Sequence, residues 1–336
     1  MRYIPAALAL TLVLLGGCAT PAASPAAPIT PGPVSRYGLL HVAGRRIVGA
    51  DGQPVSLAGV SFGWSQWQAA RFYNAGTVNW LKQDWNAAII RAALGVHEED
   101  GYIQHPARNK ARVMRVIDAA IAADLYVLID WHDHHADQHA DLAVAFFADM
   151  ARKYVGHPNV IYEIFNEPIR GLKWSTDVKP YAEKVIAAIR AHDPANLIVV
   201  GTPNYSQDVE VAAADPVQDA NVAYTLHFYA GTHKQRLRDK AVEAMNLGAA
   251  LFVTEWGTGT ADGAGKIDVE STRSWMKFMQ QWQLSHCNWG IYDKAETVAI
   301  VLPSASSQGG WKDADLSPSG RFARELIRNW PVNPGK

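Results

Sequence analysis

Short apolar runs alternate with amphipathic segments eight times along this chain, and this alternation constrains the fold more than any other feature. The apolar runs have the length of buried strands and lie at 55–60, 87–92, 126–130, 160–164, 197–200, 222–227, 251–254 and 288–292. The amphipathic segments have a helical period and lie at 78–85, 110–123, 141–154, 181–192, 208–214, 234–247, 270–283 and 319–328. Strict alternation predicts a parallel sheet covered by helices. Because the count is eight, we expect an α/β fold closed into a (β/α)8 TIM barrel rather than an open doubly wound sheet.

A short hairpin is expected ahead of the first barrel strand. Residues 40–57 contain short strand-like runs with the turn-forming pair Asp51-Gly52 between them. We expect this N-terminal β-hairpin to cover the floor of the barrel. From residue 36 to residue 332 the composition remains globular, with no second linker, so these residues are predicted to form one domain.

The first 35 residues have the features of a targeting segment followed by a tether. Arg2 precedes an apolar run too short to span a bilayer, and Leu15-Gly16-Gly17-Cys18 follows. Residues 1–17 are therefore predicted to be a lipoprotein-type signal peptide and Cys18 the lipidated residue; a plain secretory signal is the alternative. Residues 18–35 are rich in Pro and Ala and are predicted to be a tether. Ala19, rather than Asp, follows the cysteine, so we expect a secreted or cell-envelope protein, held at the outer membrane by its lipid.

Charge and cysteine content exclude several classes of protein. The chain has 31 basic and 32 acidic residues, which argues against a nucleic-acid partner and against membrane contact other than through the lipid anchor. Cys287 is the one cysteine after Cys18, so no internal disulfide is expected, and its apolar surroundings predict a buried filler. No glycine-rich phosphate loop follows a strand, so no nucleotide cofactor is expected. A monomer is expected.

Polar residues at the C-terminal ends of the predicted strands are the catalytic candidates, because all of these ends open onto one face of a barrel. The ends carry Arg91, Asp130-Trp131-His132, Asn166-Glu167-Pro168, His227-Phe228-Tyr229, Glu255-Trp256 and Trp289. A carboxylate on a buried strand is costly unless it is paired or has a chemical task. Glu167 and Glu255, on the fourth and seventh strands, would meet across the mouth of the barrel. Two facing carboxyls are what glycoside hydrolysis requires, with retention at a separation of about 5 Å and inversion at a wider one.

These strand ends resemble those of glycoside hydrolase family 5, and most closely its bacterial endoglucanase branch. The two signatures are Asn166-Glu167-Pro168 and Thr254-Glu255-Trp256-Gly257. Further matching segments lie at 59–67, 131–132, 227–233 and 316–320, so the resemblance covers the chain from about residue 37 to residue 330. It implies that residues 36–332 are the catalytic domain of a glycoside hydrolase.

The resemblance implies a role for each matching residue. Glu167 would be the general acid/base, which must hold a proton until it gives it away, and Glu255 the nucleophile. The substrate-binding residues would be Arg91 and Tyr229 beside the nucleophile, Asn166 on the sugar 2-hydroxyl, His132 and His227 around the cleaved sugar, Trp289 beneath it, Trp67, Lys294 and Glu296 toward the non-reducing end, and Tyr205 on the leaving-group side. No metal and no organic cofactor are expected.

Each assignment has a simpler structural alternative. The two glutamates could be salt-bridge partners, and the two histidines could be core residues bonded to backbone groups. Trp67 and Trp289 could be barrel packing, while Lys294 and Glu296 could pair with each other on a loop. Tyr205 could be an ordinary surface ring.

The predicted function is that of a retaining endo-β-1,4-glucanase, a cellulase that acts on β-1,4-glucan polysaccharides or oligosaccharides. The same chemistry on mannan or another β-glucan is the first alternative, because neither the fold nor the pair of carboxylates determines which of these glycans is the substrate. The loop at 132–139 is unusually rich in histidine and raises a second alternative, a metal-dependent hydrolase, although it lacks the H-E-x-x-H spacing. A third alternative, an inactive glycan-binding protein, is disfavoured by the presence of both glutamates.

Overall fold

Eight parallel strands close into a barrel, as the alternating pattern predicts. The computed structural model describes residues 1, 3 and 31–331. The barrel strands are β3 (Ala58–Phe62), β4 (Ile89–Gly95), β5 (Tyr126–His132), β6 (Val160–Glu163), β7 (Ile198–Val200), β8 (Val222–Tyr229), β9 (Leu251–Gly257) and β10 (His286–Ile291). Each strand pairs with its neighbours in chain order, and β10 pairs with β3 to close the sheet. The predicted (β/α)8 TIM barrel is confirmed.

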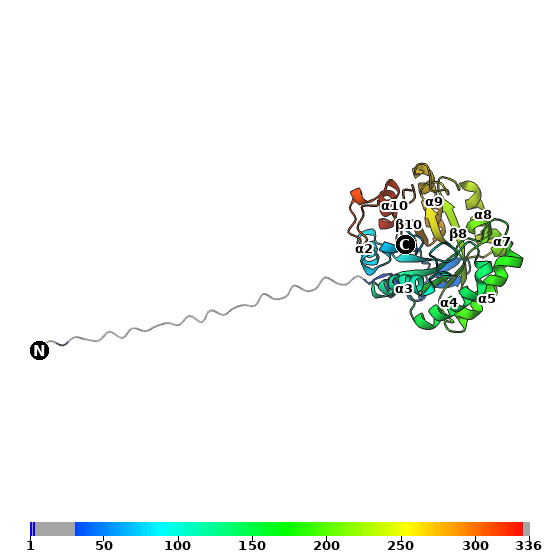
Figure 1. Ribbon diagram of the computed structural model, residues 1–336, viewed down its shortest axis with the longest axis horizontal. Coiled ribbons are helices and arrows are strands. Elements are labelled where there is room, and N and C mark those ends of the chain that lie inside the picture. Colours follow the sequence, from blue (N-terminus) through cyan, green and yellow to red (C-terminus); the bar gives the residue numbers. More distant parts are fainter. Residues whose placement is uncertain (2, 4–30, 332–336) are drawn as a thin grey trace. The chain divides into compact units, whose positions relative to one another are not determined.

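Helices surround this barrel on the outside (Figure 1). They are α2 (Ala75–Trp85), α3 (Pro106–Ala122), α4 (Ala140–Tyr154), α5 (Lys179–Arg190), α6 (Pro203–Ser206), α7 (Val209–Ala214), α8 (Gln235–Asn246), α9 (Val269–Trp282) and α10 (Pro318–Arg328). Side-chain caps fix where several of them begin: Asn74, Asp268 and Ser317 each accept a hydrogen bond from a backbone N–H of the following first turn. Within the described part of the chain, none of the helices is both long and apolar enough to cross a bilayer.

The N-terminal hairpin is confirmed, but its turn lies elsewhere than predicted. Strands β1 (His41–Ala43) and β2 (Arg46–Val48) pair antiparallel around Gly44 and Arg45. Gly44 has a positive φ of 58°, which a glycine adopts without steric cost. The Asp51-Gly52 pair forms a second turn, after which Val55 donates its N–H back to the carbonyl of Ile47.

The hairpin covers the end of the barrel opposite the strand ends that carry the candidate site. Helix α1 (Pro33–Tyr37) and the hairpin bring Val34, Leu40 and Ile47 into one apolar cluster with inward-facing residues from the beginnings of the strands, such as Ile89 and Leu128. Cys287 is fully buried in this cluster and unpaired, as predicted. The predicted signal peptide, the predicted lipidation site Cys18 and residues 18–30 of the predicted tether lie outside the described residues, apart from residues 1 and 3.

The interior of the barrel changes from apolar to charged along the strands. Side chains two residues apart on a strand face the same side of a sheet. Ile89 is followed on the inner face by Arg91, Leu128 by Asp130, and Ile161 by Glu163. Arg91, Asp130 and Glu163 are all fully buried, so a layer of charge lies above the apolar floor. This layer supports the candidate site at the C-terminal mouth.

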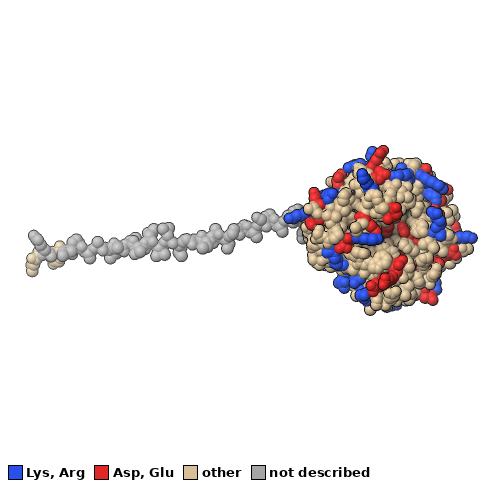
Figure 2. Space-filling view, turned by 45° about the horizontal axis from the view of Figure 1, so that its top comes forward, with Lys and Arg blue, Asp and Glu red and all other residues tan. Residues whose placement is uncertain are grey.

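On the face seen in Figure 2, basic and acidic side chains are interspersed across the surface. The distribution agrees with the formal net charge of −1. We find there no broad region of one sign of the kind that a polyanion-binding protein presents.

Candidate active site

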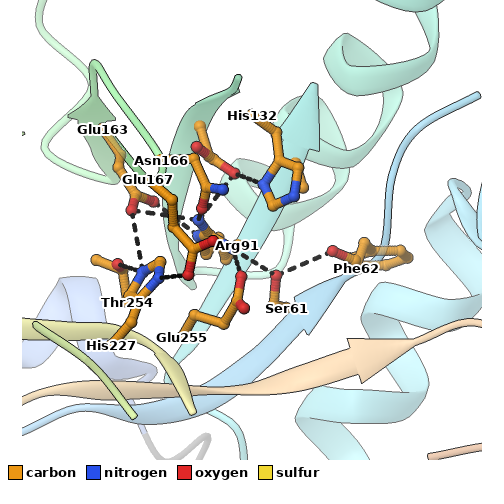
Figure 3. Close-up of polar contacts among 12 residues, drawn as sticks. Ser61, Phe62, Arg91, His132, Glu163, Asn166, Glu167, His227, Thr254 and Glu255 are labelled. Carbon is orange, nitrogen blue, oxygen red and sulfur yellow. Dashed lines mark hydrogen bonds and ion pairs between the residues drawn. The ribbon is translucent and has the colours of Figure 1, made fainter. Parts of the chain in front are cut away.

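Arg91 is the centre of the buried polar layer (Figure 3). Its guanidinium donates to both carboxylate oxygens of Glu163, at 2.7 and 3.2 Å, and to Oδ1 of Asn166 at 2.6 Å. It also donates to Oε2 of Glu255 at 3.0 Å and lies 3.0 Å from Oδ2 of Asp130. One rigid guanidinium therefore fixes side chains from β5, from β6 and the loop after it, and from β9. Arginine suits this role because its planar donors point in fixed directions.

Glu255 is held by two donors at the mouth of the barrel. Its Oε2 receives the Arg91 hydrogen bond, and its Oε1 accepts a 2.6 Å hydrogen bond from the Tyr229 hydroxyl. Burial, and next the Glu255 charge, raise the pKa of Tyr229 well above its usual value, so the phenol stays a donor. The side chain of Glu255 is 5% exposed, which leaves the carboxylate open only toward the mouth. Both contacts that the resemblance implies for Arg91 and Tyr229 are present.

Glu167 lies between two imidazoles. Its Oε1 is 2.8 Å from Nδ1 of His227, whose Nε2 lies 2.8 Å from the hydroxyl of Thr254. Its Oε2 is 3.3 Å from Nε2 of His134, on the loop that follows β5. Burial alone raises the pKa of Glu167, but the hydrogen bonds from His134 and His227 outweigh burial and hold it well below its usual range. For His227, burial lowers the pKa, but Glu255, Glu163 and Glu167 raise it to about 9.

The free enzyme therefore holds the proton on the imidazole of the Glu167–His227 pair rather than on the carboxylate. This differs from the expectation that Glu167 itself stays protonated until it acts. The difference comes from His227 and His134, which together supply more stabilisation of the anion than burial removes. The proton lies one 2.8 Å hydrogen bond away from Glu167.

The two candidate catalytic carboxylates come close together. A carboxylate oxygen of Glu167, a carboxylate oxygen of Glu255 and a ring nitrogen of His227 all lie within 4.8 Å of one another. Glu167 follows β6, and Glu255 is in β9, on the far side of the barrel. The 4.8 Å limit joins one oxygen of each carboxylate, and it is comparable to the separation of about 5 Å at which one carboxyl can attack the anomeric carbon directly.

Aromatic rings form one wall of a cleft beside this pair. Trp289 and His132 lie parallel, with ring centroids 5.1 Å apart and planes 4° apart. Nδ1 of His132 is 2.7 Å from Asp130, and burial lowers the pKa of His132 well below its usual value, so the ring is neutral. Trp64 meets the His132 ring edge-on at 4.4 Å and stacks on Trp67 at 5.1 Å. The rings thus form a continuous row from Trp289 through His132 and Trp64 to Trp67.

This cleft contains four of the predicted substrate-binding residues. It has a volume of about 160 Å³ and is lined by Trp64, Trp67, Gln68, Ala69, Trp289, Tyr292, Lys294 and Glu296. Lys294 and Glu296 form an ion pair with each other, and the Tyr292 hydroxyl donates to Glu296 at 3.0 Å. The pairing that we considered as an alternative role is therefore present, and it forms part of the cleft wall.

Tyr205 lies beside the segment that carries Glu167. Its backbone N–H donates to the carbonyl of Pro168 at 2.8 Å, and its side chain is partly exposed. Asn204, Tyr205 and Ser206 all have left-handed φ angles, between 56° and 61°, which non-glycine residues adopt only when the surroundings hold them there. The Ser206 hydroxyl provides such a restraint through a 2.7 Å hydrogen bond to the carbonyl of Asn166. A sugar contact by Tyr205 stays a prediction.

The structure adds contacts that we did not predict from the sequence, both for Asp130, already a strand-end candidate, and for three polar residues to which we had assigned no role. Glu163 and Asp130 pair with Arg91, Thr254 orients His227, and His134 contacts Glu167. The period-two pattern of a strand contains a signal for the first two, because Glu163 and Asp130 lie two residues beyond the apolar inner residues Ile161 and Leu128.

The histidine-rich loop has a hydrogen-bonding role in the structure. The buried carboxylate of Asp133 lies 2.7 Å from Nδ1 of His97 and 2.7 Å from Nδ1 of His139, and it accepts the backbone N–H of His135. Among residues 31–331, the one group with the spacing of metal ligands is Glu167, His227 and Glu255, which does not include the loop. The loop therefore gives no support to the alternative of a metal-dependent hydrolase.

Comparison with known proteins identifies the family. The model of the cellulase family, glycosyl hydrolase family 5, matches residues 48–295. The chain belongs to glycosyl hydrolase family 5. It is 49% identical over 298 residues to endoglucanase Z of Dickeya dadantii, an alignment that covers 88% of this chain and 68% of that relative. It is 43% identical over 293 residues to an endoglucanase of Clostridium saccharobutylicum, covering 86% of this chain and 65% of that relative. The chain thus spans about two thirds of the length of these relatives.

Solved structures of this family have the same fold. The catalytic domain of Thermobifida fusca endoglucanase Cel5A, in a variant crystallised with cellotetraose, matches with a TM-score of 0.84 and 34% sequence identity. The match covers 88% of this chain and 99% of that domain. The family resemblance stated from the sequence is confirmed.

Proposed function

We propose that this family 5 enzyme is a retaining endo-β-1,4-glucanase that uses Glu255 as nucleophile and Glu167 as acid/base. The observation that carries the proposal is that one oxygen of Glu167 and one oxygen of Glu255 lie within 4.8 Å of each other, while Glu255 accepts hydrogen bonds from Arg91 and Tyr229. Inverting enzymes separate their carboxyls by roughly 6.5–9.5 Å to leave room for a water. The shorter gap favours double displacement.

In the first step, one oxygen of Glu255 attacks the anomeric carbon of the sugar over Trp289. The bond from this carbon to the bridging oxygen breaks, and Glu167 delivers a proton to that oxygen, so the leaving chain departs as an alcohol. The products are a glycosyl ester on Glu255 and a shortened glucan. Arg91 and Tyr229 keep the nucleophile oriented, and Asn166, fixed by Arg91, faces the sugar 2-hydroxyl in this proposal.

The proton for this step comes from the Glu167–His227 pair. In the free enzyme the imidazole holds it, and the 2.8 Å hydrogen bond is the path by which it reaches the carboxylate. A pair that interacts this strongly titrates as a unit, so the enzyme keeps its acid for as long as the pair keeps one proton.

In the second step, a water replaces the departed chain. Glu167, now a carboxylate, accepts a proton from the water while the water oxygen attacks the anomeric carbon of the glycosyl ester. The bond to Glu255 breaks, the sugar leaves with its original configuration, and the pair has regained its proton. The low pKa of Glu167 in the unliganded site keeps the carboxylate ionised, as a base must be before it accepts a proton.

Relatives named endoglucanases, at 42–49% identity, and the family structure with cellotetraose support a β-1,4-glucan as the substrate. The aromatic cleft suits the flat faces of glucose rings, because an aromatic side chain and the face of a sugar ring bury apolar surface against each other. Product profiles on carboxymethylcellulose, lichenan, mannan and xylan distinguish a glucanase from an enzyme with the same chemistry on another glycan. Faster release from mannan than from either glucan would reassign the substrate.

Variants of the two glutamates test the catalytic roles. Glu255→Ala and Glu167→Ala should each lower hydrolysis of a soluble glucan roughly a thousandfold or more while leaving the far-UV circular dichroism unchanged. With an activated aryl cellobioside and azide, we expect an α-glycosyl azide from Glu255→Ala and a β-glycosyl azide from Glu167→Ala, because azide occupies the space of the missing carboxylate. Glu325→Ala, the same change at an exposed glutamate, is the matched control. Azide products of the opposite configurations would reverse the two roles.

We also propose that the protein is an outer-membrane lipoprotein anchored through Cys18. The apolar run and Leu15-Gly16-Gly17-Cys18 support this proposal. Metabolic labelling with radioactive palmitate should mark the wild type and not Cys18→Ser. Equal labelling of both proteins, or of neither, would refute the lipid anchor.

A further inference from the structure

The loop that follows β5 delivers a second imidazole to the acid/base, and this contact has no place in the double-displacement chemistry described above. Oε1 of Glu167 is occupied by His227, while Oε2 faces Nε2 of His134 at 3.3 Å. The His134 side chain is 29% exposed and the Glu167 side chain 16% exposed, so water screens this contact only in part.

His134 is held in place by a clamp built on a buried carboxylate. Asp133, the preceding residue, is fully buried and lies 2.7 Å from the ring nitrogens of both His97 and His139. The same carboxylate accepts the backbone N–H of His135 at 2.8 Å. These three contacts join the buried carboxylate to groups on both sides of His134. They fix the backbone of the loop, because breaking them would leave a buried charge without partners, which is costly.

Neighbouring rings restrict the orientation of His134 from the other sides. Its ring lies edge-on to Trp64 at 5.6 Å and to His97 at 5.8 Å, and 6.4 Å from His132. The imidazole is thus enclosed by aromatic groups, with one ring nitrogen directed at Glu167. A loop histidine that served only for solubility would not need an enclosure of this kind.

We propose that His134 is a positioning residue for the acid/base, which orients Oε2 of Glu167 and lowers the proton affinity of the Glu167–His227 pair. This inference rests on the proposed role of Glu167. The protonated pair has no net charge, whereas the pair without its proton is negatively charged, so a donor that faces Glu167 stabilises the deprotonated pair more. His134 therefore sets the upper pH at which the enzyme still holds its catalytic proton.

Other titratable groups surround His134. They are Glu167 after β6, His227 on β8, Glu255 on β9, the neutral His132 on β5, and His97 with Asp133 on the loops that follow β4 and β5. Burial lowers the pKa of His134, but its hydrogen bond to Glu167 and the Glu167 charge outweigh burial and raise it. Removing the His134 ring takes away a contact of the acid/base Glu167. The nucleophile Glu255 keeps its hydrogen bonds from Arg91 and Tyr229.

The test compares pH profiles of kcat/KM for the wild type, His134→Leu and His134→Gln. The substrates are an aryl cellobioside with a poor leaving group, which needs the proton, and 2,4-dinitrophenyl cellobioside, which does not. With the poor leaving group, the alkaline limb of His134→Leu should move to higher pH, so that its activity relative to the wild type is roughly threefold greater at pH 9 than at pH 6. The acid limb should stay in place.

Two further variants separate positioning from folding. His134→Gln keeps an N–H donor and should shift the limb less than His134→Leu. His135→Leu removes the neighbouring ring, whose side chain makes no hydrogen bond in the described structure, and should leave the limb unchanged. With the activated substrate, the activity of each variant relative to the wild type should not change with pH, and His135→Leu should match the wild type.

Unchanged pH limbs in His134→Leu would overturn the proposal, as would equal losses on both substrates, because a purely structural role lowers activity without regard to leaving group or pH. Failure of the proposed function looks different: the wild type itself would then cleave neither cellobioside.

Discussion

Replacing Glu163 by glutamine tests whether the buried polar layer stabilises the barrel through charge. Glu163 is fully buried and takes two hydrogen bonds from Arg91. Burial alone raises its pKa, but Arg91 and His227 outweigh burial and lower the pKa from 4.5 to about 2. Glutamine preserves the shape and removes the charge, and Arg91 keeps Asp130 and Glu255 as partners.

The magnitude follows from linkage between protonation and folding. A shift from 4.5 to about 2 corresponds to about 3 kcal/mol of stability that the ionised carboxylate contributes. Because the folded-state pKa of Glu163 is lowered, this contribution is complete above pH 5.5 or so and is lost as the pH falls toward the folded value. About 1 kcal/mol should be gone by pH 4 and about 2 kcal/mol by pH 3.

Urea unfolding of the wild type and Glu163→Gln at pH 7, 5.5, 4 and 3 measures this dependence. The stability difference between the two proteins should be about 3 kcal/mol at pH 7 and should shrink at each lower pH. Glu325→Gln, at an exposed site paired with Arg273 at 3.3 Å, is the matched control and should change stability by less than about 0.5 kcal/mol. A difference for Glu163→Gln that stays constant across this range would refute the reasoning.

Further changes probe the rest of the site. Tyr229→Phe removes the 2.6 Å hydrogen bond to Glu255 and should lower kcat/KM roughly 10- to 100-fold in steady-state assays on a soluble glucan. Trp289→Ala should raise KM roughly tenfold, and Trp67→Ala less, because Trp67 is 39% exposed; equal effects would contradict this order. Activity on substrates that need the proton should fall above about pH 9, where His227 loses its charge, and a fall beginning near pH 7 would contradict the assigned pair. Cys287→Ser buries a hydroxyl in the apolar floor and should cost about 1–3 kcal/mol in urea unfolding, and a neutral effect would contradict the burial.

The fold could be predicted from the sequence because barrel strands buried on both faces leave continuous apolar runs. Eight such runs, each followed by a helical period, leave few architectures other than a closed parallel barrel. The position predicted for the hairpin turn was wrong, and the reason is local. Asp51-Gly52 is the stronger turn signal, but pairing of Ala43 with Arg46 places the connection at Gly44 and Arg45.

The candidate active site could be predicted in part, because strand ends identify residues that reach the mouth. Glu167, Glu255, Arg91 and Tyr229 were found in this way, and the structure brings them together. Glu163 was missed because it lies below the mouth, within the strand, where only the alternation of inner and outer side chains indicates it. His134 was missed as a partner of Glu167 because the conformation of the loop depends on Asp133, and one of the partners of Asp133, His97, comes from a distant segment.

The protonation state of Glu167 could not be predicted from the motif. A buried carboxyl alone would favour the neutral acid. Two imidazoles reverse this preference: His227, on β8, lies 2.8 Å from Oε1 of Glu167, and His134, on the loop after β5, lies 3.3 Å from Oε2. Folding alone brings these three side chains together.

Trapping the covalent intermediate tests the central claim most directly. A 2-deoxy-2-fluoro cellobioside with an activated leaving group should form a stable ester, since the fluorine slows both formation and hydrolysis of the intermediate, while the good leaving group restores the rate of its formation alone. Mass spectrometry of the intact protein should show the added mass of one 2-deoxy-2-fluorocellobiosyl group, and peptide mapping should place it on Glu255. A label on Glu167, or turnover with no covalent species and an inverted product, would contradict the account.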